Sequence, residues 1–337
     1  MLTLAAALAG GALCHLIGVP LAWLIGAMLG TAALAWRRPV AVHGAARPLA
    51  LVVLGLAFGQ TFSGPVLAAL LGALPAVLLA ALLSIAAGVA AVPIFTRLAG
   101  LDAKTGFYAA VPGGVVVMAV MAQRAGAPIA PVTLAQTIRM VVVVLTVPTL
   151  LTALAPPGDA AGFTAPLVPF APTGLLVMLV LGVLAALGLR RTGMANPWML
   201  GPCALAILAS GFGVLPSSVP SPVVDAAQVA MGATLGQRLT REFLLSSRRL
   251  LGASVVSALF LVLVCLGFGA ALGWASGLPL GAVMLGLAPG GMPEMGVTAK
   301  TLGHAVPLVM AFHLTRTLSC NFVLGPIWAG LARLGWR

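Results

Sequence analysis

The chain has 337 residues, of which 61% are hydrophobic and only 7% are charged. A soluble domain carries about 25% charged residues and exposes them to water, so the composition excludes an ordinary soluble domain and indicates an integral membrane protein. The 17 Lys and Arg outnumber the 5 Asp and Glu and give a net charge of +12. Because these residues lie in short loops between apolar runs, they fit the positive-inside bias of membrane proteins better than nucleic-acid binding.

Apolar runs predict membrane helices along the whole chain. The first run lacks a preceding basic region, so we interpret it as a membrane helix and not as a signal peptide. The runs lie at residues 2–18, 21–36, 49–62, 74–96, 106–123 and 129–154, and then at 173–189, 197–215, 223–237, 251–274, 279–299 and 305–332. A Pro-rich segment separates the two sets, so we predict a first membrane repeat at 1–155, a linker at 156–172 and a second repeat at 173–337.

An internal duplication relates these two halves. The segment Trp23–Gly26 matches Trp198–Gly201 as a Trp-x-x-Gly motif. Three further matches keep one constant spacing, namely Gly55-x3-Gly59-Gln60 with Gly232-x3-Gly236-Gln237, Pro112-Gly113-Gly114-x3-Met118 with Pro289-Gly290-Gly291-x3-Met295, and Arg139 with Arg316. Matches at one spacing over so long a stretch indicate two related repeats.

The basic loops predict that the repeats are inverted. Six full spans per half would give both halves the same orientation. The basic loops, however, follow the even-numbered runs of the first half, as at Arg37, and the odd-numbered runs of the second half, as at Arg190. If the Pro-Gly-Gly run of each half is a broken or re-entrant hairpin, each half crosses five times and the second is inverted. With a cytoplasmic N-terminus, every Lys and Arg then lies inside except Arg139 and Arg316, within membrane segments, and Lys300 outside. Six spans per half with a weak charge bias is the alternative.

The two Pro-Gly-Gly segments are the first candidate site. Proline lacks an N–H and glycine relaxes the backbone, so each predicts a helix break. Such breaks at matching positions of two halves indicate a transporter binding site, with packing kinks as the alternative. The candidate substrate-binding residues here are Pro112, Gly113, Gly114, Pro289, Gly290 and Gly291.

The intramembrane charges are the second candidate site. Arg139 and Arg316 lie within long apolar helices, one turn after Gln136 and His313, respectively. A pair of guanidinium groups near broken helices suits an anion, especially a carboxylate. The alternative is structural, with each Arg capping helix carbonyls of the nearby hairpin or extending to an interface.

Glu294 is the one acidic residue deep in an apolar run. A buried carboxyl group can carry a proton or hold a cation, so we predict a coupling role for Glu294 and for His313. Arg316 or His313 could pair with it, in which case the alternative is an ion pair that fixes helix packing. Gln60 and Gln237 follow Gly-x3-Gly motifs that permit close helix approach, and their amides either line the site or make packing hydrogen bonds.

With these motifs, the chain resembles the bacterial AbrB family of membrane proteins, whose members are internally duplicated. The resemblance rests on the Trp-x-x-Gly segments, on Gly59-Gln60 and Gly236-Gln237, and on the two Pro-Gly-Gly segments, and it covers nearly the whole chain. It implies regulation of gene expression or, by another family label, ammonia monooxygenase activity. The latter would need copper or iron, but the four His are scattered without a carboxylate cluster, so we expect no enzyme.

These observations predict an all-α polytopic protein of the bacterial inner membrane that acts as a secondary transporter for a small anionic organic solute, coupled to protons or sodium. A membrane regulatory or sensor protein is the alternative, and a membrane monooxygenase is less favoured. We expect the lipid bilayer and a small-molecule substrate as partners, with a homodimer left open. The four Cys lie apart in apolar runs, and Walker A and Rossmann motifs are missing, so we expect no metal, cofactor or nucleic acid.

Overall fold

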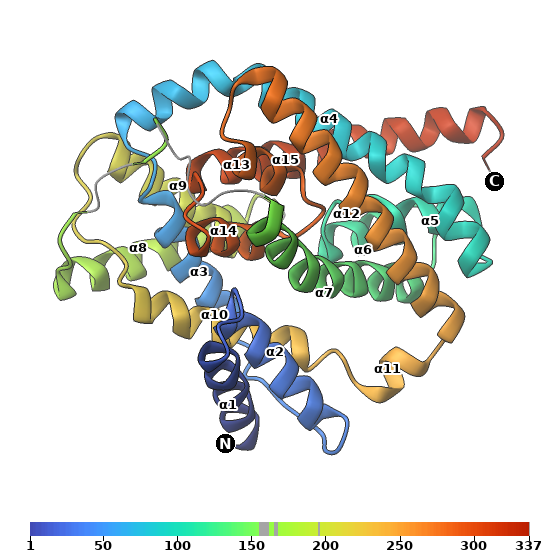
Figure 1. Ribbon diagram of the computed structural model, residues 1–337, viewed down its shortest axis with the longest axis horizontal. Helices are drawn as coiled ribbons and strands as arrows, with labels where there is room; N and C mark the ends of the chain where they lie inside the picture. The colour runs from blue at the N-terminus through green and yellow to red at the C-terminus, as the bar shows by residue number, and fades with distance from the viewer. Residues whose placement is uncertain (155–161, 165–167, 195, 337) are drawn as a thin grey trace.

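The computed structural model describes residues 1–154, 162–164, 168–194 and 196–336, and their regular secondary structure is all helical. Figure 1 shows the helices in chain order. The first half contains α1 (Leu2–Leu16), α2 (Ala22–Ala35), α3 (Ala46–Gly59), α4 (Gly64–Ala99), α5 (Ala103–Ala110), α6 (Val115–Arg124) and α7 (Ile129–Leu154). The second contains α8 (Pro172–Arg190), α9 (Pro197–Gly211), α10 (Ser221–Gly236), α11 (Arg241–Leu245), α12 (Arg248–Ser276), α13 (Leu280–Leu287), α14 (Met292–Thr301) and α15 (Val306–Arg333).

Several helices are long and apolar enough to cross a membrane. Within the described residues, α4, α7, α8 and α12 meet this condition. Helix α15 makes a fifth span if its two segments, bent by 50° between Val306–Cys320 and Phe322–Arg333, are counted together. Leu71 on α4, Leu176 on α8 and Leu263 on α12 are each more than 60% exposed. Outward-facing apolar side chains on such helices fit contact with lipid, and the all-helical polytopic membrane class is thereby supported.

Most predicted runs coincide with helices, but one differs clearly. Helix α4 begins at Gly64 and not at residue 74, because Pro65 suits the first helical turn and Pro75 is accommodated inside the helix. Much of the predicted linker, at 156–161 and 165–167, lies outside the described residues, as does residue 155 at the end of the first predicted repeat. Helix α8 begins at Pro172, the last residue of that linker.

Both Pro-Gly-Gly segments interrupt helices. Helix α5 ends at Ala110 and α6 begins at Val115, while α13 ends at Leu287 and α14 begins at Met292. Gly114 has a φ of +90°, a conformation that L side chains rarely adopt. These four short helices therefore come in two pairs, each with an irregular segment between its members, and α13 and α14 lie near the centre of the view in Figure 1.

Helices of the two halves pack against one another in a reciprocal pattern. Helix α10 packs on α2 and α9 packs on α3, while α12 packs on α7 and α15 packs on α4. A Cβ atom on Gly55 of α3 would lie 2.6 Å from the carbonyl oxygen of Met199 on α9. At the matching position, a Cβ atom on Gly232 of α10 would collide with the carbonyl oxygen of Leu24 on α2. The Gly-x3-Gly motifs thus permit close contact between halves, as small residues do in membrane helices.

Candidate functional site

A cavity of about 340 Å³ lies where the two helix breaks meet. Its wall includes the backbone of both breaks and the cationic side chains of Arg47, Arg139 and Arg316. Glu294 is the acidic group in this wall. Apolar and uncharged residues complete it, among them Pro48, Leu51, Val115, Val117, Met140, Asn196, Pro197, Trp198, Leu200, Met292, Pro293 and Thr317. The predicted residues Pro112, Gly113, Gly114, Gly290 and Gly291 are all part of the wall, whereas Pro289 is not among the lining residues.

Arg139 joins the two breaks through its guanidinium group. Its Nη1–H groups donate to the carbonyl oxygens of Ala110 (3.4 Å) and Val111 (3.2 Å) at the end of α5. Its Nε–H donates to the carbonyl of Pro289 in the second half at 3.1 Å. The side chain is 4% exposed, so these carbonyls and the side chain of Gln136 take the place of water around the charge. Cations are stabilising at helix C-termini, which accounts for the contact with α5.

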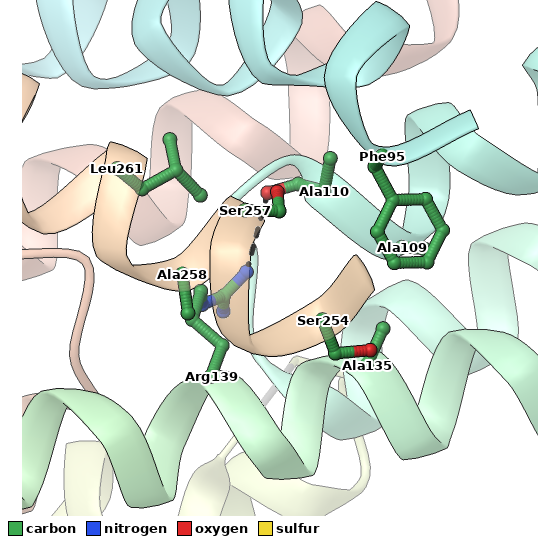
Figure 2. Close-up of a pocket in the computed structure, with 9 residues that line it drawn as sticks. All are labelled: Phe95, Ala109, Ala110, Ala135, Arg139, Ser254, Ser257, Ala258 and Leu261. Carbon is green, nitrogen blue, oxygen red and sulfur yellow. Dashed lines mark hydrogen bonds between the residues drawn. The ribbon is translucent and has the colours of Figure 1, made fainter. Parts of the chain in front are cut away.

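Gln136 supports Arg139 from one turn away. Its Oε1 accepts a 2.7 Å hydrogen bond from Nη2 of Arg139, and its Nε2 lies within 3.1 Å of the carbonyls of Tyr108, Ala109 and Val111. Figure 2 shows Arg139 extending from α7 toward Ala110. A separate cavity of about 10 Å³ beside it has room for about one water molecule. The guanidinium group is therefore fixed on several sides.

Arg316 makes the matching contacts in the second half. Its Nη1–H donates to the carbonyl of Ala288 at 2.7 Å and its Nη2–H to the carbonyl of Gly290 at 2.6 Å, just beyond the end of α13. Nη2 also lies 3.0 Å from Nδ1 of His313. Since a guanidinium only donates, Nδ1 accepts and Nε2 carries the proton that is donated to the carbonyl of Leu285 at 3.1 Å. His313 is therefore neutral in this arrangement, with both ring nitrogens engaged.

The two Arg differ at one atom. Nε of Arg139 is bonded across the halves, but Nε of Arg316, also buried, has no hydrogen-bond partner among the described residues. The break between α5 and α6 also has a contact from the second half, but with a weaker donor. Sγ of Cys320 lies 3.8 Å from the carbonyl oxygen of Pro112. Arg316 thus borders the cavity with one donor unused, and a buried donor without a partner is uncommon in proteins.

Glu294 is fully buried in the first turn of α14. Neither of its carboxylate oxygens has a hydrogen-bond partner in the described part of the chain. A Cβ atom on Gly291 would collide with Oε2, which places the carboxyl group against the second break. The predicted pairing with Arg316 or His313 is not formed, because both of those side chains bind backbone carbonyls and each other.

Gln60 and Gln237 lie outside the cavity wall and bind loops of the opposite half. Oε1 of Gln60 accepts from the backbone N–H of Val219 at 2.9 Å. Oε1 of Gln237 accepts from the backbone N–H of Val42 at 3.1 Å. The same contact is made twice with the halves exchanged, and hydrogen bonds of this kind are what the packing alternative for these two amides predicts.

Sequence reasoning missed Arg47 as a cavity residue. Its charge was assigned to a loop, but α3 begins at Ala46, so Arg47 lies in the first turn and borders the cavity. Trp198 was recognised as part of a repeated motif and not as a lining residue, and it also borders the cavity. The repeat of the Trp-x-x-Gly motif was the available signal for Trp198, whereas no local pattern distinguishes Arg47 from the other loop cations.

Fold and site together define a polytopic helical membrane protein with a largely apolar cavity, bordered by a few charged side chains, between broken helices. A family model described as "Transition state regulatory protein AbrB" matches residues 23–332, and the chain belongs to this family. It is 28% identical to "Uncharacterized protein YhjN" of Bacillus subtilis (strain 168) over 97% of this chain and 91% of that protein. It is 26% identical to "Putative regulator AbrB" of Escherichia coli (strain K12) over 80% of this chain and 78% of that protein.

Proposed function

We propose that this protein is a secondary transporter of the bacterial inner membrane that moves a small anionic organic solute. The observation that carries the proposal is the cavity of about 340 Å³ bordered by both helix breaks, Arg139 and Arg316. Broken helices with paired positions in two halves are the arrangement by which many transporters bind substrate within the membrane.

The architecture we propose is two inverted repeats of five spans, each with its Pro-Gly-Gly segment as a broken or re-entrant hairpin. The exchanged contacts support a twofold relation between the halves, because Gln60 binds Val219 and Gln237 binds Val42. The basic loops support a cytoplasmic N-terminus. The substrate then binds where the halves meet, and the binding site opens alternately to the two faces of the membrane.

The chemistry of the wall favours an anion. The start of α6 has no side-chain cap and adjoins the cavity, so its backbone N–H groups and helix dipole favour negative charge. Arg47 and Arg316 add positive charge. We propose no enzymatic activity and no cofactor, and we expect the bilayer and the solute as partners, without nucleic acid.

Glu294 is the proposed coupling group. An ionised carboxylate that is buried without a partner is costly, so the carboxyl group at this position takes up a proton or binds a cation before the cavity changes its exposure. His313, with both ring nitrogens engaged, contributes by holding Arg316 in place. Coupling and substrate binding would therefore occur within one cavity.

Transport in proteoliposomes tests the proposal. The purified protein is reconstituted, a pH or sodium gradient is imposed, and uptake of radiolabelled carboxylates and amino acids is measured. We expect gradient-driven uptake that Glu294→Gln uncouples from the gradient, while Arg333→Gln, at an exposed site at the end of α15, behaves as the native protein. Absence of both binding and flux for every compound in the native protein would refute transport.

The name of the Escherichia coli relative, "Putative regulator AbrB", favours a second function, that of a membrane regulator. In that case the cavity binds a signal molecule, and its occupancy changes gene expression through a partner protein. The discriminating experiment is a chromosomal deletion combined with the reconstituted protein. Altered expression together with ligand binding but without flux would support the regulator.

A further inference from the structure

Two of the three cationic side chains in the cavity wall are already engaged by the protein. The Arg139 guanidinium group donates to three backbone carbonyls at the helix breaks and to Gln136. Arg316 donates to two carbonyls of the second break and to His313, and its remaining Nε is buried. Both side chains are at most 5% exposed. A solute could therefore reach either guanidinium group only by displacing the protein groups packed around it.

Arg47 is the third cation of the wall, and it differs from the other two. It lies in the first turn of α3 and is partly exposed. No hydrogen bond or ion pair joins its side chain to another residue in the described part of the chain. Glu294, the acidic group of the same wall, has no hydrogen-bond partner there on either carboxylate oxygen, so it does not neutralise Arg47 by direct contact. The N–H donors of the Arg47 guanidinium group are thus available to an anion.

The charge of Arg47 is reinforced at this end of the cavity. Burial, and then the positive charge of Arg47, lower the pKa of Arg238, which follows α10, so the two guanidinium groups lie within electrostatic reach of each other. The first turn of α9, with Pro197, also borders the cavity, and the exposed Arg190 and Arg191 precede it. Neighbouring charges of one sign raise the local concentration of oppositely charged solutes. This end of the cavity therefore attracts anions.

The wall beside Arg47 is apolar. Leu51 lies four residues after Arg47, so both side chains are on one face of α3, and both border the cavity. Val115, Met140 and Trp198 are further apolar lining residues. One available cation beside apolar side chains suits a solute with a single carboxylate and an apolar body, because a second carboxylate would lose its water without gaining a partner. The volume of about 340 Å³ is of a size that holds a small molecule.

We infer that the solute is a monocarboxylate with an apolar body and that Arg47 binds its carboxylate. This inference rests on the proposed transport function and specifies both the substrate class and the binding group. The planar guanidinium group can donate two parallel hydrogen bonds to the two carboxylate oxygens. Arg139 and Arg316 then hold the two helix breaks in place and do not contact the solute. The cation that sequence reasoning missed thereby takes the binding role first given to those two.

Three small probes test the inference on the purified full-length protein. 4-Methylpentanoate is charged at neutral pH, 4-methylpentanamide has nearly the same shape without the charge, and succinate has two carboxylates. Binding of each is measured by calorimetry. We expect the native protein to bind 4-methylpentanoate at least about tenfold more tightly than the amide, because hydrogen bonds between charged groups are the stronger ones. We expect it to bind succinate more weakly than 4-methylpentanoate as well.

Variants of Arg47 assign the carboxylate site. In Arg47→Gln we expect 4-methylpentanoate and the amide to bind within about twofold of each other. Arg47→Lys keeps the charge but not the planar pair of donors, so it should weaken binding of the carboxylate by about three- to tenfold and leave the amide unchanged. Arg238→Gln removes a nearby charge from outside the lining residues. It is the matched control and should keep the native preference within about twofold.

Three results would overturn the inference. The native protein could bind 4-methylpentanoate no more tightly than the amide or succinate, or Arg47→Gln could keep the native preference. The preference could also return in Arg47→Gln/Glu294→Gln, which would show that Arg47 only balances the charge of Glu294. The transport function is decided separately, by uptake of the wider panel in proteoliposomes, and falls only if no compound binds or moves. Should Arg47→Gln fail to fold, Arg47→Lys and the native protein decide.

Discussion

The Nε–H of Arg139 donates a 3.1 Å hydrogen bond to the carbonyl oxygen of Pro289, and so joins α7 of the first half to the break of the second. The same guanidinium group binds Ala110 and Val111 at the end of α5. One side chain therefore fixes the positions of both breaks relative to each other. Any change in the relative position of the halves at the cavity must stretch or replace this contact.

Replacing Arg139 by Lys should destabilise the protein although the charge is kept. A lysine ammonium is compact and cannot span the carbonyls of Val111 and Pro289 in the planar geometry that a guanidinium offers. We expect a loss of about 2–4 kcal/mol of stability from the orphaned carbonyls and Gln136, with loss of transport. Thermal unfolding in detergent and proteoliposome uptake measure these effects, and Arg333→Lys is the control. A native melting temperature for Arg139→Lys would contradict the role.

Replacing His313 by Gln should preserve function. Gln136 occupies the matching position in the first half, where Oε1 accepts from Arg139 and Nε2 donates to carbonyls. A Gln at 313 can likewise accept from Arg316 and donate to Leu285. We expect near-native stability and gradient-driven uptake for His313→Gln, but a loss of about 1–3 kcal/mol for His313→Leu. If His313→Gln abolished gradient dependence, His313 would be a titrating member of the coupling machinery.

Replacing Gly55 by Ala should separate α3 from α9. The new Cβ would lie 2.6 Å from the carbonyl oxygen of Met199, so one of the two helices must shift. Overpacking of this kind costs about 1–3 kcal/mol. Gly72 of α4 is the matched control, because a Cβ there meets nothing within 4 Å and Ala favours a helix by roughly 0.5–1 kcal/mol over Gly. We expect Gly55→Ala to lower the melting temperature and Gly72→Ala to raise it. Equal shifts for the two variants would argue against close α3–α9 contact.

Replacing Asp102 by Ala should lower stability in a pH-dependent way. Asp102 caps α5, and although burial raises the pKa of its carboxyl group, hydrogen bonds from the hydroxyl and N–H of Thr105 and from neighbouring backbone N–H groups together lower the pKa below its usual value. A lowered folded pKa adds stability above the unfolded pKa, and this is lost as the pH falls through the folded value. We expect Asp102→Ala to cost about 1 kcal/mol at pH 7 and less near pH 3. Melting temperatures that differ equally at both pH values would contradict this.

Replacing Gln60 or Gln237 by Leu should weaken the contact between the halves without altering which solute is bound. Gln60 is 2% exposed, and its loss leaves the buried N–H of Val219 without a partner, whereas Gln237 is half-buried. We therefore expect the larger loss, about 1–3 kcal/mol, for Gln60→Leu. Thermal unfolding and the binding ratio of two probes are the measurements. A changed ratio would place these amides in the binding site.

The sequence predicted the helix breaks because Pro and Gly act locally, through a missing N–H and a permissive backbone. It also identified Arg139 and Arg316 as unusual, since charges within apolar runs are rare. It could not predict how they differ, because the bond from Arg139 to Pro289 joins residues separated by 150 positions. Arg47 was missed for a related reason, since its place in the cavity wall depends on where α3 begins and on what packs beside it.

The paired glutamine contacts have a consequence for biosynthesis. The backbone N–H of Val42 is held by Gln237, a residue made 195 positions later. When the first half enters the membrane, this loop and the α10-facing side of α2 still lack their partners. Helices α1 and α2 therefore lack their packing contacts with α10 until α10 is inserted. Contacts between residues so far apart in the sequence slow folding. Truncation anywhere before residue 237 leaves the first half without the segment that completes it.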